Sequence, residues 1–461
     1  MPLRVCALLV LAASVVFPQE TRRTVALVVS GGIVVTMDGS GRVLSPGAVA
    51  VDGRDIVAVD TPQAIAARFA GREAIDATGQ VVMPGLINTH THAPMVLYRG
   101  LADDLALMDW LQKYIFPAEA KTVTPEFVRA GTRLAALEMI RSGTTTYADM
   151  YYFEEEIAKV TRDAGLRGVL GQTIIQFPVA DARTPAEGLA RAERFIRQFA
   201  GDELIVPAVA PHSMYTLDTA TLKAVRALAD RTHAPVLIHL SETADETRTS
   251  LAKHKATPAR YLESIGFWGP RTLAAHGVWL SAPDMALLAR RHVAVSHNPE
   301  SNMKLASGSA KVVALRRAGV VVGLGTDGAA SNNDLDMFEA MRQAAFLAKL
   351  QTSDPRAIPA RAALEMATID GARALGMDQQ VGSIEAGKRA DLIAVSMTSA
   401  RQTPMYDPLS HLVYATHGDD VTTTIVNGRV LMRERKVVTL DEAAVLAEAR
   451  ALAEKVRAAV R

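Results

Sequence analysis

The chain has 461 residues, 49% of them apolar, which is enough for one large core and a smaller one and excludes wholesale disorder. Its 50 Lys and Arg against 49 Asp and Glu give a formal net charge of +1, so nothing suggests the basic face that nucleic acid requires. The single cysteine, Cys6, excludes an intramolecular disulfide and a cysteine-based zinc site, so any metal must be held by histidines and carboxylates.

The first twenty residues differ from the rest. A start that carries one positive charge, Arg4, leads into an uncharged apolar run of 13 residues from Val5 to Phe17. This pattern is typical of a secretory signal peptide, and the run is too short to span a bilayer stably. We therefore expect residues 1–20 to be a signal peptide, the protein to be exported, and the mature chain to have no stable membrane span. The alternative is a mis-assigned start and a cytoplasmic protein.

Both ends of the remaining chain read as β-structure. Short apolar runs separated by pairs such as Gly31-Gly32 and Asp52-Gly53 fill residues 24–80, and they indicate strands joined by tight hairpins. The same texture returns over residues 379–440. We predict that these two segments form one small β-sandwich domain, followed by a C-terminal helix over residues 441–461.

The middle of the chain, residues 81–378, alternates strands and helices. One helical pattern is the apolar face of residues 125–141. The apolar strand candidates are 81–88, 144–149, 168–175, 204–210, 235–240, 272–277, 292–297 and 320–326. This alternation predicts the α/β class and a (β/α)8 TIM barrel, in which the chemistry lies at the carboxyl ends of the strands.

Reactive side chains lie at the ends of most of these strands. The first strand ends in His90-Thr91-His92, and its two imidazoles point the same way because residues two apart in a strand share a face. Further candidates end or follow later strands: His212, His239, His276, His297 and Asp327. One such pair would be read as ordinary surface histidines, but the joint pattern predicts a single metal-binding and catalytic centre.

Several motifs resemble those of the amidohydrolase superfamily. They are Met83-Pro84-Gly85-Leu86-Ile87-Asn88-Thr89-His90-Thr91-His92, His239-Leu240-Ser241-Glu242, His276 and Gly325-Thr326-Asp327-Gly328. Pro117-Ala118-Glu119-Ala120-Lys121, Pro211-His212-Ser213-Met214-Tyr215 and the segments 296–306 and 327–333 are similar to the 5-methylthioadenosine/S-adenosylhomocysteine deaminase branch. The resemblance covers about residues 25–440. It implies a hydrolase that acts on carbon–nitrogen bonds other than peptide bonds.

The donor set suits a divalent metal ion. Three neutral imidazoles, His90, His92 and His239, with the carboxylate of Asp327 favour Zn²⁺, and Fe²⁺ is the alternative. Such an ion lowers the pKa of a water molecule to about 7. Relatives with two metal ions would carry a carboxylated lysine at the end of the fourth strand, where this chain has His212, so one ion is expected.

Two further groups complete the expected chemistry. Glu242 lies three residues beyond His239 and can act as a general acid–base on the ring nitrogen next to the attacked carbon. The family resemblance implies that His276 and Asp327 orient and deprotonate the attacking water. It also implies that Glu119 accepts hydrogen bonds from ribose hydroxyls, that His212 contacts the purine, and that Glu242 and Asp327 touch the substrate.

We therefore predict a metal-dependent hydrolytic deaminase of an adenine nucleoside. The resemblance names 5-methylthioadenosine, S-adenosylhomocysteine or a related 5′-modified adenosine as the small-molecule substrate. Some relatives that bind homocysteine have Arg after the third strand, where this chain has Gln172, and Arg183 is the nearby substitute. This departure favours methylthioadenosine over S-adenosylhomocysteine.

Two other functions remain open at this stage. One is a related hydrolase that acts on another heteroaromatic ring of the guanine or triazine type, because only the pocket lining would differ. The other is a non-catalytic scaffold, which would be expected to lack the metal ligands that are present here. Barrels of this type often pair, so a homo-oligomer is compatible with the sequence.

Overall fold

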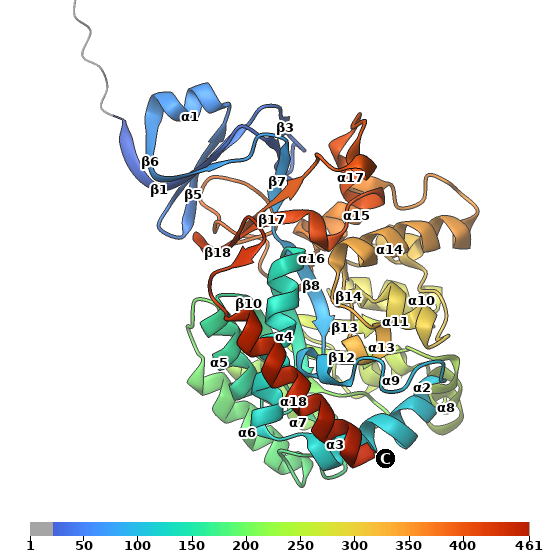
Figure 1. Ribbon diagram of the computed structural model, residues 1–461. Coiled ribbons are helices and arrows are strands. Elements are labelled where there is room, and N and C mark those ends of the chain that lie inside the picture. The colour runs from blue at the N-terminus through green and yellow to red at the C-terminus, as the bar shows by residue number, and fades with distance from the viewer. Residues whose placement is uncertain (1–21, 461) are drawn as a thin grey trace, which may run out of the picture.

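The computed structural model describes residues 22–460, so the signal peptide predicted for residues 1–20 lies outside the described residues. A barrel forms the larger part of the molecule, and smaller sheets cap one end of it (Figure 1). Among the helices of the described part, none is both long and apolar enough to cross a membrane.

Eight parallel strands form the central sheet and follow one another in chain order. They are β8 (Leu86–Thr91), β9 (Thr144–Tyr151), β10 (Arg167–Ile174), β11 (Ile205–Pro211), β12 (Val236–Leu240), β13 (Thr272–His276), β14 (Ala294–His297) and β15 (Val322–Leu324). The two ends of the sheet meet: Asn88 Nδ2 donates to Thr326 Oγ1 at 2.7 Å, and Thr89 Oγ1 donates to Leu324 O at 2.9 Å. The predicted TIM-type barrel is confirmed.

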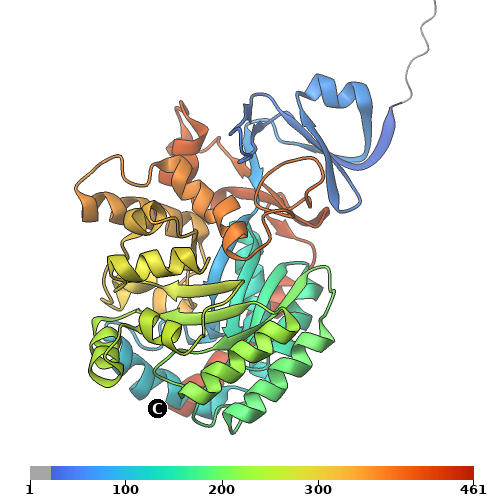
Figure 2. The same ribbon diagram turned by 180° about the vertical axis from the view of Figure 1, so that it is seen from behind.

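Helices cover the outside of the strands, as the view from behind shows (Figure 2). Those of the barrel region are η1 (Ala93–Tyr98), α2 (Leu107–Asp109), the π-helix η2 (Trp110–Ile115), α3 (Phe116–Thr122), α4 (Pro125–Ser142), α5 (Glu154–Ala164), α6 (Pro185–Gln198), α7 (Thr219–Thr232), α8 (Ala244–His254), α9 (Pro258–Ser264), α10 (Ala282–Arg290), α11 (Pro299–Lys304), α12 (Val312–Arg317), α13 (Ala329–Asn332), α14 (Met337–Thr352), α15 (Ala360–Ala367) and α16 (Ile369–Ala374). In α4 the side chain of Thr124 caps the first turn, and Gly143, with φ of 87°, ends the helix.

The structure corrects the prediction of one strand over residues 81–88. The chain forms β7 (Gln80–Pro84) and then β8, and the two strands belong to different sheets. Gly85 separates them, and a Cβ atom there would lie 2.1 Å from the Thr145 side chain, so only glycine fits. An apolar run cannot reveal this division because both halves are buried.

Two smaller sheets hold both ends of the described chain. One contains β5 (Asp55–Asp60), β4 (Ala48–Asp52), β1 (Arg23–Ser30) and β6 (Phe69–Asp76), in that order. The other contains β19 (Lys436–Val437), β18 (Arg429–Arg433), β17 (Val421–Val426), β16 (Leu392–Ser396), β7, β2 (Ile33–Val35) and β3 (Val43–Leu44). Buried side chains from both sheets, among them Val49, Val82 and Leu392, form one hydrophobic cluster. The second sheet joins strands from both ends of the chain, as the sandwich prediction requires.

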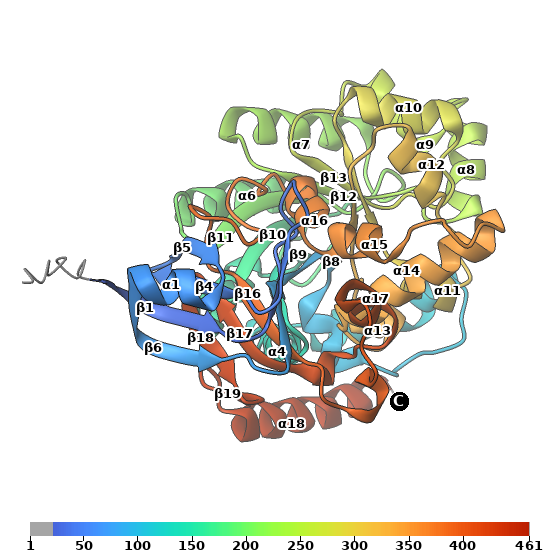
Figure 3. The same cartoon turned by 90° about the horizontal axis from the view of Figure 1, so that it is seen from above.

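The remaining helices are α1 (Pro62–Arg68), η3 (Ala400–Gln402), α17 (Pro408–Tyr414), η4 (Gly418–Asp420) and α18 (Glu442–Val460). Helix α18 lies along the outside of the barrel beside α4 (Figure 3). Arg133 of α4 pairs with Glu448 of α18 through its Nε atom at 2.9 Å. In Figure 1 strand β8 leads away from the small sheets, so its carboxyl end opens at the far end of the barrel.

Candidate metal centre and active site

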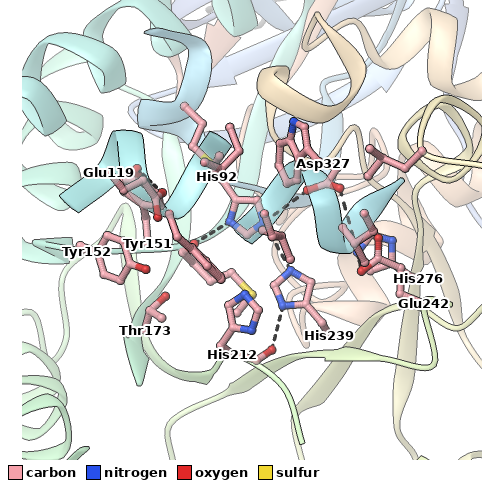
Figure 4. Close-up of a pocket in the computed structure, with 18 of the residues that line it drawn as sticks. His92, Glu119, Tyr151, Tyr152, Thr173, His212, His239, Glu242, His276 and Asp327 are labelled. Atoms are coloured by element: carbon pink, nitrogen blue, oxygen red, sulfur yellow. Dashed lines mark hydrogen bonds and ion pairs between the residues drawn. The ribbon is translucent and has the colours of Figure 1, made fainter. Parts of the chain in front are cut away.

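The predicted site residues lie together at the carboxyl ends of the barrel strands, and Figure 4 shows all of them except His90. Glu119 comes from α3, in the insertion that follows β8. The others lie at strand ends: His90 in β8 and His92 just after it, His212 after β11, His239 in β12 and Glu242 after it, His276 at the end of β13, and Asp327 after β15. All of them except His90 line a single pocket.

Five of these side chains meet closely enough to hold a metal ion. Ligand atoms of His90, His92 and Asp327 lie within 4.8 Å of one another, and so do those of His90, His239 and His276. Asp327 Oδ1 is 3.4 Å from His90 Nε2 and 3.3 Å from His92 Nε2. The structure thus brings together all four residues predicted as ligands, with His276 beside them.

Backbone carbonyls fix the tautomers of two of these histidines. Nδ1 of His92 lies 2.7 Å from Met150 O, and Nδ1 of His239 lies 2.7 Å from His212 O. A carbonyl only accepts, so each neutral ring donates Nδ1–H and presents the lone pair of Nε2. The two Nε2 atoms face each other at 3.3 Å, where lone pairs repel unless a cation lies between them. His90 Nε2 is also buried without a hydrogen-bond partner among the described residues. The donor set fits a divalent cation.

The pKa values of the four candidate ligands also favour a bound cation. Burial lowers the pKa of His90 to about 4 and the pKa of His239 well below its usual value, so both rings are neutral at pH 7. Burial also opposes charge on His92, but the negative charge of Asp327 beside it outweighs burial and raises the pKa of His92 to about 9. In Asp327, burial is outweighed by the adjacent imidazoles of His90 and His92, which hold its pKa well below the usual value. The cluster therefore attracts one positive charge, which is a proton when no metal ion is bound.

Two site residues have a strained backbone. The φ angle is 66° at Asp327 and 75° at His276, in the left-handed region that side chains other than glycine rarely adopt. Ser301 Oγ donates to Asp327 Oδ2 at 2.7 Å, and the backbone N–H of Gly328 donates to Oδ1 at 2.8 Å. Strain of this kind persists only where neighbours hold it, and it concentrates at active sites.

Glu242 and His276 form a second group beside the metal ligands. His276 Nε2 lies 3.7 Å from Glu242 Oε2 and 4.0 Å from Asp327 Oδ2. His276 Nδ1 donates a hydrogen bond to the amide oxygen of Asn302 at 2.9 Å, and the opposite ring nitrogen, Nε2, faces the two carboxylates. Burial raises the pKa of Glu242, against the opposing effect of His276. Glu242 thus holds a proton more readily than an exposed glutamate does, as a general acid requires.

Glu119, which comes from α3, lines the same pocket. Its side chain is buried, and Tyr151 Oη donates to its Oε1 at 2.7 Å. Burial raises the pKa of Glu119 to about 7, although the hydrogen bond from Tyr151 lowers it. A carboxylate that is held by one tyrosine and lines a pocket can accept further hydrogen bonds from a ligand.

His212 lines the pocket beside the metal cluster. Its Nδ1 atom lies 3.3 Å from both Ser213 Oγ and Thr216 Oγ1, which leaves the other ring nitrogen for a ligand. Its ring centre is 4.7 Å from that of His239. Burial lowers the pKa of His212 to about 3, so the ring is a neutral hydrogen-bonding group at pH 7.

The rest of the pocket wall is largely apolar. The space between the lining atoms, with the open solvent at its mouth included, is about 590 Å³. Its apolar lining consists of Met95, Leu107, Trp110, Leu111, Ile115, Phe116, Met150 and Leu305. Over residues 22–460, neither lysine nor arginine lines this pocket.

Three other residues named from the sequence lie outside the pocket. Gln172 is buried within β10, and its Nε2 donates to Asp181 Oδ2 at 2.8 Å. Arg183 is exposed on the loop that follows. His297 is buried at the end of β14 and belongs neither to the pocket lining nor to either group of metal ligands. The structure thus gives neither Gln172 nor Arg183 a contact with the pocket, and it does not add His297 to the site.

Three residues that form hydrogen bonds with the predicted site residues were not predicted from the sequence. Tyr151, Met150 and Asn302 contact Glu119, His92 and His276 respectively. Nothing in the local sequence marks Tyr151 or Met150. Asn302 lies in the family-like segment 296–306, but its contact with His276 cannot be read there because the partner lies elsewhere in the chain. Glu246 had a readable signal, since Thr243 and Glu246 have the spacing of a helix capping box.

Comparison with known proteins places the chain in a family. The Amidohydrolase family model matches residues 81–431. The 5-methylthioadenosine/S-adenosylhomocysteine deaminase of Syntrophobacter fumaroxidans is 46% identical over 431 residues, covering 94% of this chain and 98% of that protein. The 5′-deoxyadenosine deaminase of Methanosarcina barkeri is 46% identical, with 93% and 98% covered. An adenosine deaminase from Xanthomonas campestris with bound zinc has a TM-score of 0.93 at 42% identity, covering 95% of this chain and 100% of that one. The chain belongs to the amidohydrolase family, as its motifs predicted.

Proposed function

We propose that this chain is a metal-dependent aminohydrolase that removes the amine of a 5′-modified adenine nucleoside as ammonia. The observation that carries the proposal is one pocket that joins the converging Nε2 atoms of His92 and His239, the Glu242–His276 pair and the buried Glu119. The names of the three relatives, all deaminases of adenine nucleosides, support the same class of substrate.

One Zn²⁺ ion per chain is the proposed cofactor. Imidazoles with one carboxylate are donors that zinc prefers, and the similar adenosine deaminase contains zinc. Fe²⁺ would suit the same donors. Such an ion lowers the pKa of a water molecule to about 7, so that hydroxide is present at neutral pH.

The protein side chains account for the proton transfers. Asp327 Oδ2 and His276 Nε2 lie 4.0 Å apart, and these two side chains can orient the water and take up its proton. The water oxygen adds to the ring carbon that bears the amine, while Glu242 gives its proton to the neighbouring ring nitrogen. The proton taken from water then passes to the amine, which leaves as ammonia, and the hydroxyl on that carbon gives its proton to Glu242 as it becomes the oxo group of the product. The raised pKa of Glu242 suits this first donation.

The pocket favours a nucleoside with an uncharged 5′ group. The two oxygens of Glu119 match two vicinal ribose hydroxyls, and His212 is placed to contact the base. The carboxylate of S-adenosylhomocysteine would find no cationic side chain in the pocket lining of the described chain. We therefore propose 5-methylthioadenosine or 5′-deoxyadenosine as better substrates than S-adenosylhomocysteine.

An ammonia-release screen tests the function directly. The zinc-loaded protein would be offered adenosine, 5-methylthioadenosine, 5′-deoxyadenosine, S-adenosylhomocysteine, guanine and an amino-triazine. We expect the highest kcat/KM on an uncharged 5′-modified adenosine. A preference for guanine or the triazine over every nucleoside would overturn the proposed substrate class.

A further inference from the structure

Glu246 holds the backbone of the residue proposed as the general acid. It lies in the first turn of α8, is 8% exposed, and is absent from the pocket lining. Its Oε1 accepts the backbone N–H of Ser241 at 2.9 Å, and its Oε2 accepts the backbone N–H of Glu242 at 2.9 Å. Both oxygens of one buried carboxylate are therefore used on two consecutive amides at the base of Glu242.

This arrangement departs from ordinary helix capping. In a capping box the glutamate at the third helical position accepts from the N–H of the capping residue itself, which here is Thr243. The side chain of Thr243 does cap the helix, since it accepts from Glu246 N at 3.2 Å. Glu246 reaches past the cap to the two residues before it, so helix capping alone does not explain its position.

The backbone that Glu246 grips also needs support. Ser241 has φ of 50°, in the left-handed region, and the chain must turn there to bring Glu242 beside His276. The loop that carries His276 is tied to the same segment: Gly277 N donates to Leu240 O at 3.0 Å, and Trp279 N donates to Ser241 O at 2.9 Å. A shift of this short segment would therefore change the distance between Glu242 and His276.

We infer that Glu246 is a positioning residue for the reaction, which acts through Glu242 by fixing the Ser241–Glu242 backbone beside His276. The inference rests on the acid–base role given to Glu242 in the proposed function. It adds a residue that touches neither the substrate nor the metal ligands, yet determines where the proton donor sits.

The Glu246→Gln variant tests this inference. The new carboxamide can accept from only one of the two amides, because its NH₂ group would face the other N–H. We expect kcat to fall about 10–100-fold, KM to change less than about 3-fold, and the zinc content to stay at the level of the unmutated protein. The Glu242→Gln variant alone, and the variant with both changes, should have the same activity within about 3-fold, because Glu246 acts only through Glu242.

Asp284 provides a matched control. It is a buried carboxylate at the start of α10 that accepts the backbone N–H of Ser281 at 3.0 Å, and it lies eight residues after His276 but outside the pocket lining. Asp284→Asn should lower stability but leave kcat and KM unchanged. An equal loss of kcat in Asp284→Asn would show a general effect of weakened helix starts and overturn the inference.

A second measurement does not depend on activity. Amide hydrogen exchange in the whole zinc-loaded protein should speed up in the segment from Leu240 to Thr243 of Glu246→Gln, and not in that segment of Asp284→Asn. Unchanged exchange there, normal kcat in Glu246→Gln, or losses that multiply with Glu242→Gln would each overturn the role of Glu246. Failure of the substrate proposal would look different, because the unmutated protein would then release no ammonia from nucleosides, and the same kinetic comparison would use the ring that it does hydrolyse.

Discussion

Single residues carry the metal centre, and each of its ligands can be tested. His239→Ala, His90→Ala, His92→Ala or Asp327→Ala should remove most of the bound zinc, because the remaining donors cannot complete the coordination. Elemental analysis of the purified variants measures this. His254, a half-buried histidine of α8 stacked on Tyr261 with 3.8 Å between ring centres, serves as the control whose loss should leave the metal in place. Full zinc occupancy in His239→Ala would contradict the ligand assignment.

Glu119 can be tested as the ribose ligand. Hydrogen bonds to a charged group contribute roughly 1.5–3 kcal/mol each, so Glu119→Ala should lower kcat/KM on a nucleoside by about 10–100-fold or more. The 2′,3′-dideoxy analogue should lose a similar factor on the unmutated enzyme, since it lacks the hydroxyls that Glu119 contacts.

The two losses at Glu119 should not add. The variant already lacks the carboxylate, so removing the hydroxyls from its substrate should cost little more. Kinetics on all four combinations of enzyme and substrate decide the point. Losses that multiply, or an equal loss on nucleoside and free base, would place ribose recognition elsewhere.

At this scale the sequence reveals residues whose position follows from the strand pattern. His90 and His92 could be assigned to one face because alternation along a strand is a local rule. Asn302 and Tyr151 could not, because their role is to contact a side chain from a distant strand end. Such partners follow from packing, which a single sequence does not show.

Among the elements, the link between β10 and β16 is the one we expect to matter most for stability. Arg167 at the start of β10 is buried, and its Nε lies 3.0 Å from Asp391 Oδ2, just before β16. Asp391→Asn would leave the buried guanidinium of Arg167 without a negatively charged partner, so the free energy of unfolding should fall by about 3–5 kcal/mol. Denaturant titration measures this loss, and kcat/KM of the folded enzyme should be unchanged.

An exposed pair provides the comparison for that prediction. Arg23 and Asp52 are 2.8 Å apart at the surface of the small sheets. Asp52→Asn should cost less than about 1 kcal/mol, because solvent screens exposed charges. Equal losses in the two variants would mean that burial does not distinguish the pairs.

The number and order of the barrel strands could be predicted, but some boundaries could not. The strands of the barrel lie within a few residues of the apolar runs, because a parallel strand is buried on both faces. The division at Gly85 was missed because it depends on Thr145, which approaches from β9. Local sequence gives the run, and the neighbouring strand decides where it changes sheets.

For the whole molecule, the open prediction concerns the start of the mature chain. The charged start and short apolar run predict removal of about the first twenty residues during export. Mass spectrometry of the protein expressed with its native N-terminus should find a chain that begins near residue 20. An intact N-terminus on protein from the cytosolic fraction would contradict export.

The sheet that joins both ends of the chain has a consequence for synthesis on the ribosome. Met83 of β7 pairs with Ile393 of β16, about 310 residues later, so β7 waits for its partner until most of the protein has been made. Every strand of the barrel leaves the ribosome before β16 does. During that interval β7 presents an unpaired apolar edge, which favours association between nascent chains. A chain that is released before β16 should therefore aggregate rather than fold into a smaller enzyme.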